Sequence, residues 1–164
     1  MGPTCSIIYE NEPMEKNTLL QKPRPYSNTF FNWTELNTSI LQGLIITVGT
    51  LCIYQFAVYH SFNETITRSM VFTTLISANI LLTLINRSFY YSILTTLRYK
   101  NNLVLYVILI TVGLLGMLIY IKPLAQLFEF EALNFIQLIF SISTGFVSVI
   151  WYEVIKWKNR KMNG

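Results

Sequence analysis

The chain has 164 residues, of which 52% are hydrophobic and only 12% are charged. Soluble domains carry about 25% charged residues, so water is excluded as the main solvent of this protein. The net charge of +4 would suit nucleic acid in a polar protein, but here the basic residues flank apolar stretches, where membrane orientation and anionic lipid explain them. We therefore expect a lipid bilayer as partner and no nucleic acid.

Four uncharged apolar stretches occupy most of the sequence. They cover residues 39–59, 69–86, 103–121 and 132–152. A helix of about 20 apolar residues crosses the hydrocarbon core, which is roughly 30 Å thick. Short connections follow the first and third stretches and favour antiparallel neighbours. The predicted fold class is therefore all-α, a multi-pass integral membrane protein whose four transmembrane helices form two antiparallel hairpins.

The basic residues predict how the chain is threaded. The connections after the first and third stretches contain only Arg68 and Lys122, so the other ten of the twelve lysines and arginines lie at the opposite side. The positive-inside rule assigns that side to the cytoplasm. Both termini are therefore expected in the cytoplasm, and the expected location is the plasma (inner) membrane.

Polar and small residues inside the stretches indicate helix contacts or an ion pathway. Asn79 lies in the middle of the second stretch, and Thr73, Thr74 and Thr83 share parts of its surface. Its amide suits an ion ligand or pathway residue, and it also suits hydrogen bonding between helices, which is common in helix bundles. Two small-residue runs, 141–148 and 113–116, predict close approach of neighbouring helices.

The membrane stretches lack the residues of a complete transport or catalytic site. No acidic or basic residue lies in their central turns, whereas a hard cation normally needs carboxylate ligands. The sequence also lacks GxxxxGK[ST] and GxGxxG, the glycine-rich patterns that bind phosphates. For this chain alone we expect no catalytic residues, no catalytic activity and no cofactor.

Five segments of the chain resemble one protein family. Residues 1–17, with Glu12-Pro13, and residues 19–24, with Lys22-Pro23-Arg24, resemble the end of the sixth membrane helix and the next loop of P-type cation-transporting ATPases of the calcium-pump type. Later segments resemble the eighth helix, the outer end of the ninth and the basic close of the tenth. These are Ala78–Ser88, Tyr120–Leu124 and Trp151–Arg160.

The resemblance implies a C-terminal membrane support domain of a cation pump, with calcium as the cation, truncated and lacking the ATP-hydrolysing domains. It divides the chain into a cytoplasmic linker with the remnant of a preceding membrane helix (1–38), a four-helix transmembrane domain (39–158) and a basic cytoplasmic tail (159–164). ATP, magnesium and calcium are implied only for a complete pump. The implied partners are the remaining helices and domains of that pump.

Two departures from the family pattern reduce the ion site that can be carried over. Met1 stands where the sixth helix of the family supplies a carboxylate, and Ala78 stands where some calcium pumps carry an ion-binding glutamate. Asn79 is then the one candidate metal-site residue. The alternative function is a free-standing four-helix membrane protein that acts as an accessory or assembly factor through its small-residue faces.

The predicted threading can be tested by cysteine labelling in a chain without Cys5 and Cys52. A cysteine at Asn63 should react with a membrane-impermeant reagent added outside, because it lies in a connection poor in basic residues. A cysteine at Asn159 is the control and should react only after the membrane is opened. Labelling of position 63 from the cytoplasmic side alone would contradict this topology.

Overall fold

All regular secondary structure in the described part of the chain is helical. The computed structural model describes residue 10 and residues 33–86 and 102–163. The helices are α2 (Trp33–Tyr59), α3 (Glu64–Ile85), α5 (Asn102–Tyr120), α6 (Lys122–Leu127) and α7 (Phe135–Asn163). The all-α prediction is confirmed. The predicted linker falls mostly on residues 1–32, outside the described residues.

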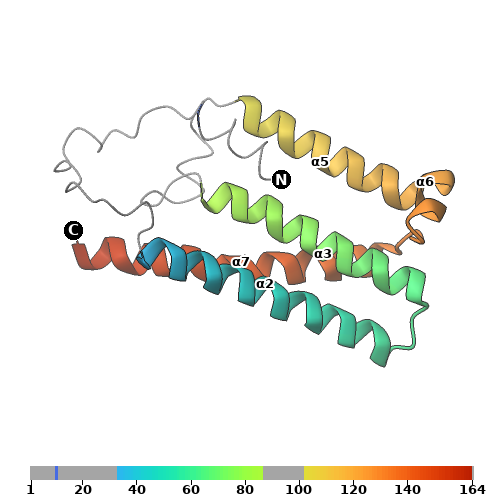
Figure 1. Cartoon of the computed structure of the whole chain (residues 1–164), viewed down its shortest axis with the longest axis horizontal. Helices are drawn as coiled ribbons and strands as arrows, with labels where there is room; N and C mark the ends of the chain where they lie inside the picture. The colour runs from blue at the N-terminus through green and yellow to red at the C-terminus, as the bar shows by residue number, and fades with distance from the viewer. Residues whose placement is uncertain (1–9, 11–32, 87–101, 164) are drawn as a thin grey trace.

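Four of these helices are long and apolar enough to cross a membrane. The candidate spans are Leu36–Tyr59, Glu64–Ile85, Leu103–Tyr120 and Phe135–Ile155. Each contains most of one predicted stretch. Figure 1 shows successive long helices running in alternate directions. One end of the bundle, here called the loop end, carries the connections 60–63 and 121–134, and the opposite end carries the start of α2 and the close of α7 (Figure 1).

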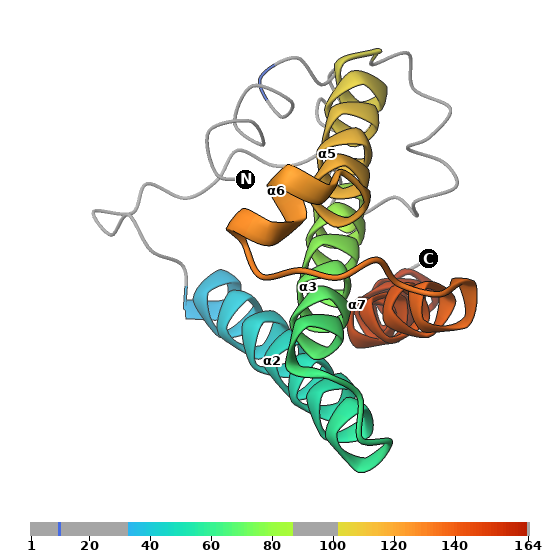
Figure 2. The same ribbon diagram turned by 90° about the vertical axis from the view of Figure 1, so that its right-hand side faces the viewer.

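The helix α3 lies at the centre of the bundle. It packs against α7 and α2, which also contact each other, while α5 contacts α6 and, more sparsely, α3. Figure 2, seen along the bundle, shows α5 on one side of α3 and α2 and α7 on the other. The expected pairing of the third and fourth spans is therefore not the principal packing. α7 instead packs on the first hairpin, because that is where its small residues find partners.

Small residues bring the backbones of α3 and α7 together. A Cβ atom built on Gly145 would lie 2.8 Å from the Thr74 carbonyl oxygen and 3.0 Å from the Ala78 nitrogen. The Thr74 hydroxyl also donates to the Ser141 carbonyl at 3.1 Å. The predicted close approach along residues 141–148 is confirmed. In the 113–116 run, by contrast, Cβ atoms on Gly113 and Gly116 would meet nothing within 4 Å, so that prediction is wrong for the contacts seen here.

Two apolar clusters join the helices. The cluster nearer the end of α3 contains Ile46, Ala78, Leu81, Ile85 and Val149, from α2, α3 and α7. The cluster at the loop end contains Ile53 and Ala57 of α2, Met70 of α3, Ile119 of α5 and Leu133 of the connection before α7. Between lipid-facing helices, association depends on close van der Waals packing, because lipid tails are as apolar as the side chains. The first cluster therefore holds α2, α3 and α7 together by fit, and the second joins the end of α5 to α2 and α3.

The helix α3 begins earlier than the apolar stretch indicated. Its first residue is Glu64, and the Asn63 side chain accepts a hydrogen bond from the Glu64 backbone N–H at 2.9 Å. The Thr67 hydroxyl donates to the Asn63 carbonyl at 3.0 Å. Asparagine is a favoured cap because its oxygen satisfies a backbone N–H that the first turn leaves unpaired. The charged first turn thus belongs to the helix, and the connection between α2 and α3 is correspondingly shorter.

The short helix α6 was not predicted. Ile121 breaks α5 with an extended backbone, and Pro123 lies in the first turn of α6, where its missing N–H costs nothing and its fixed φ suits a helix. Two residues after the last residue of α2 and of α6 comes a residue with φ of 54°, Ser61 and Glu129 respectively. In each case the next residue bonds back to the carbonyl five positions earlier, which is the Schellman arrangement usually made with glycine.

The contact between α3 and α7 predicts a difference between two glycines. Gly145→Ala should lower the free energy of unfolding by about 1–3 kcal/mol, because the added methyl group would press on the α3 backbone. Gly113→Ala is the matched control, since its methyl group meets nothing within 4 Å and alanine favours the helix by about 1 kcal/mol. Unfolding in mixed detergent micelles measures both. Equal effects of the two substitutions would contradict the packing.

Candidate functional site: the open face of α3

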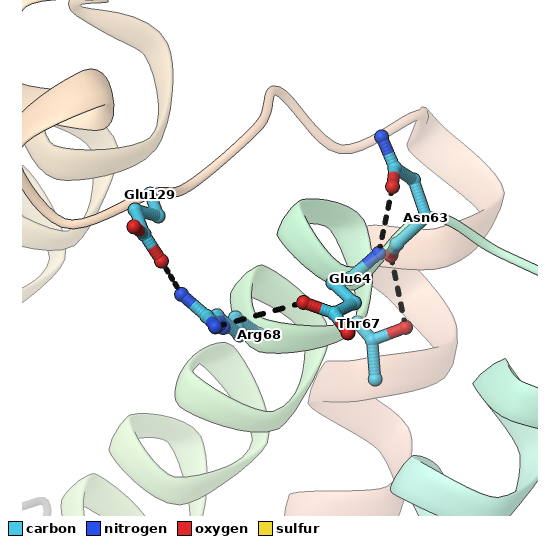
Figure 3. A network of polar contacts seen from close by, with 5 residues as sticks. All are labelled: Asn63, Glu64, Thr67, Arg68 and Glu129. Atoms are coloured by element: carbon cyan, nitrogen blue, oxygen red, sulfur yellow. Dashed lines mark hydrogen bonds and ion pairs between the residues drawn. The ribbon is translucent and has the colours of Figure 1, made fainter.

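An ionic contact joins α3 to the connection that precedes α7. The Arg68 guanidinium pairs with the Glu129 carboxylate, and it also lies 3.7 Å from the carboxylate of Glu64, one turn earlier on α3. Figure 3 shows these three side chains with the Asn63 cap and Thr67. All three charged side chains are half-exposed or more. Pairs of this kind contribute about 0.2–1 kcal/mol each, so their main effect here is to fix the position of the connection.

Two further hydrogen bonds extend this attachment. The Thr65 hydroxyl donates to the Glu131 carboxylate at 2.5 Å, and the Glu131 backbone N–H donates to the Ser69 hydroxyl at 2.9 Å. Ser69 is fully buried, so the bond to Glu131 lies in a protected place. We call the contacts of Thr65, Arg68 and Ser69 with Glu129 and Glu131 the loop-end clamp. The clamp ties the second hairpin to the first two turns of α3.

The described residues leave one side of α3 uncovered between α2 and α5. A cavity of about 580 Å³ lies along α2 and α3 and is lined by Tyr54, Val58, Phe62, Glu64, Thr67, Arg68, Val71, Phe72, Leu75 and Phe130. A second cavity, of about 350 Å³, lies between α3 and α5, and Phe72 lines both cavities. We call the side of α3 along these cavities, with its continuation one turn further to Asn79, the open face of α3. Asn79 lines neither cavity, but it follows Leu75 and Ile76 at helical spacing on the same side of the helix.

Asn79 belongs to this open face. It is half-buried, and its side-chain amide donates to the Leu75 carbonyl at 2.9 Å, within α3 itself. Thr83, one turn further, donates its hydroxyl to the Asn79 carbonyl at 2.9 Å. The structure therefore brings Asn79 and Thr83 together. Thr73 and Thr74 are fully buried on other sides of the helix, so the prediction that they share the surface of Asn79 is wrong.

The neighbouring position, Ala78, points elsewhere. Ala78 is fully buried, and its backbone nitrogen lies next to Gly145 of α7. Successive helical residues differ by about 100° around the axis, because a turn contains 3.6 residues. A longer polar side chain at position 78 would enter the tight α3–α7 contact. Of these two positions, Asn79 is the one from which a polar group reaches the open face.

The open face offers few ligands for a cation. In the described ranges there is no group of three or more histidine, cysteine, aspartate or glutamate side chains that could hold a metal ion. Calcium takes six to eight oxygen ligands, and one amide with a nearby hydroxyl supplies two. An ion bound beside Asn79 would therefore need ligands from outside the described residues.

Other polar side chains inside or near the spans join or cap helices. Gln42 of α2 exchanges hydrogen bonds with Asn86, at 3.4 and 3.5 Å, where α3 ends. Gln137 accepts the backbone N–H of Asn134 at 2.9 Å, which is half of a capping box at the start of α7. These contacts join or terminate helices and leave the open face to Asn79.

A comparison with protein families identifies the family of this chain. A family model described as the C-terminus of cation-transporting ATPases matches residues 1–158. The chain belongs to this family. The predicted resemblance to the C-terminal membrane region of a P-type ATPase is thus confirmed. A search of curated proteins finds no significant match. The four candidate spans fit an integral, multi-pass membrane domain of such an ATPase.

The loop-end clamp of this ATPase domain was not predicted from the sequence. The sequence did contain a signal for the clamp. Arg68 lies in one connection, Glu129 and Glu131 lie in another, and both connections were predicted on the same side of the membrane. Opposite charges confined to one side are within reach of each other. Their pairing still depends on α6, whose end turns Glu129 toward Arg68 (Figure 3), and α6 was not predicted.

The placement of Asn79 predicts the response to its replacement. Asn79→Leu should change the free energy of unfolding of this chain by no more than about 0.5 kcal/mol, because the substituted amide bonds only within α3. Thr74→Val is the matched control. It removes the donor to Ser141 and should cost about 0.5–1.5 kcal/mol. Unfolding in mixed micelles measures both variants. A loss of unfolding free energy above about 0.5 kcal/mol for Asn79→Leu would reveal a bond between helices and contradict this placement.

Proposed function

We propose that this chain is the C-terminal support domain of a calcium-transporting P-type ATPase, and that the ion-binding helices of the pump rest on the open face of α3. The carrying observation is the half-buried Asn79, one helical turn beyond Leu75 and Ile76, which line the two cavities on the uncovered side of the central helix. The choice of calcium rests on the resemblance of the sequence to calcium pumps. The ATP-hydrolysing domains, with ATP and magnesium, would belong to a preceding part of the same pump.

The chemistry of the open face supports a protein partner over lipid along the middle of α3. An amide exposed to hydrocarbon costs free energy unless a partner satisfies its remaining donor and acceptor capacity. Polar groups inside membrane proteins accordingly face the bundle interior or a pathway. A helix seated between α2 and α5 would turn Asn79 from a lipid-facing group into an interior one. Its side-chain oxygen would then be available to an ion or to a donor of that helix.

The remaining contacts suit a rigid base. The α3–α7 contact admits no Cβ at Gly145, and the loop-end clamp fixes the connection before α7. Pump helices that bind and release ions must move, whereas the surface that supports them must keep its shape, since a displacement of about 1 Å can cost a hundredfold in rate. The proposed role of this domain is to hold position 79 at a constant place while the helices above it change conformation.

The first experiment attaches an affinity tag to the C-terminus of the chain in its native gene. The tag should appear on, or co-purify with, a polypeptide that forms an acid-stable phosphoenzyme from labelled ATP in the presence of calcium. The chain itself has a mass of 19.1 kDa. A tagged product of that mass, isolated without any phosphorylated partner, would instead support the free-standing accessory protein.

A second experiment tests Asn79 in the phosphorylated pump. Asn79→Leu should raise the calcium concentration needed for half-maximal phosphoenzyme about tenfold, corresponding to the loss of one ligand or positioning bond of about 1.4 kcal/mol. Gly113→Ala, whose added methyl group meets nothing within 4 Å, is the control and should leave the calcium dependence unchanged. An unchanged dependence in both variants would remove Asn79 from the ion pathway and leave the support role as the remaining proposal.

A further inference from the structure

The helix α5 ends near the loop end of its membrane span. Its candidate span, Leu103–Tyr120, has 18 residues in the described part of the chain. At 1.5 Å per residue they are about 27 Å long, and the hydrocarbon core is about 30 Å thick. A helix that crosses the core with these residues reaches its edge at Tyr120.

The helix α6 lies at the end of this span. One residue, Ile121, separates it from α5, and the extended backbone of Ile121 turns the chain away from the α5 axis. Figure 2 shows α6 lying across the loop end of the bundle, near α5. The single residue between α5 and α6 is too short a connection for α6 to leave the membrane surface. We therefore expect α6 at the depth where acyl chains meet headgroups.

The residues of α6 divide into a polar and an apolar side. Lys122 and Gln126, four positions apart, share one side, while Leu124 and Leu127, three positions apart, share the other. Ala125 is buried toward the protein, but Leu127 is 74% exposed. The next residue, Phe128, is also exposed. An exposed leucine and phenylalanine opposite a lysine are typical of a helix lying in a membrane interface.

The end of α6 is held in place. The ring of Phe128 stacks on that of Phe130 at a centroid distance of 5.9 Å, and Phe130 contacts Phe72 of α3 at 5.0 Å. Glu129, between them, pairs with Arg68. Its left-handed backbone costs about 1–2 kcal/mol in a residue other than glycine, so the attachment must offset that cost. The exposed side of α6 is therefore presented by a fixed element.

We propose that α6 is an interfacial anchor that lies in the leaflet at the loop end, with Leu127 and Phe128 immersed among phospholipid acyl chains. In that position it continues the apolar surface of α5 along the edge of the hydrocarbon core. Lys122 lies beside the lipid phosphates, and the loop-end clamp lies in the headgroup layer. This membrane contact is independent of the proposed ion-transport role.

The test uses spin labels on single cysteines in the full chain, with Cys5 and Cys52 replaced by serine, in phosphatidylcholine vesicles. Labels at 127 and 128 should lie about 5–10 Å below the phosphates, the usual immersion of an interfacial apolar side. They should be reached by oxygen and protected from a water-soluble nickel complex. A label at Gln126 is the matched control on the polar side and should be reached by the nickel complex.

Two outcomes would overturn the proposal. Labels at 127 and 128 that the nickel complex reaches as readily as the label at 126 would place α6 in water. Labels shielded from both oxygen and nickel would show that a protein segment covers this side instead of lipid. Helical circular dichroism of each labelled chain, unchanged from the unlabelled chain, checks that the bundle is intact.

Discussion

The close contact between α3 and α7 is the constraint on which the rest of the structure depends. Inside a bilayer there is no hydrophobic force between helices, so association requires backbones that approach closely enough for packing and hydrogen bonds. Gly145 provides the space, and Thr74 provides the bond to the Ser141 carbonyl. Once α7 occupies this side of α3, α2 fits beside both helices, and Gly49 lies against Ser148. The remaining side of α3 is then left to α5 and to the open face.

The packing of α7 on α3 gives the adjacent residues Ala78 and Asn79 different surroundings. Ala78 must be small because α7 lies against it, whereas Asn79, about 100° further round the helix, is half-buried on the open face. The two residues are neighbours in the sequence, but the packing separates them. In a domain of the cation-transporting ATPase family, the open face is the side on which we propose that polarity inside the membrane serves the pump.

The loop end shows how charge is handled at the membrane boundary. Arg68 pairs with carboxylates from its own helix and from the connection before α7, so three charged side chains lie together at the loop end. Exposed pairs add little stability, but this one orients Glu129, and with it the end of α6. The proposed interfacial position of α6 places its apolar side beside the end of α5. Packing in the core and charge at the boundary thus fix different parts of the bundle.

The sequence by itself determined the solvent, the number of spans and their alternation, because long uncharged stretches between basic clusters have few other physical solutions. It also indicated the small-residue run around Gly145. It could not place α6, the early start of α3 at Glu64, or the contact partners of α7, since these depend on caps and on which surfaces fit in three dimensions. For the candidate site, Asn79 was already prominent in the sequence as a rare amide in mid-span. Only the tertiary structure decided that Asn79 lies on the open face while Thr74 and Ala78 face α7, because the direction of a side chain has no meaning until its helix has neighbours.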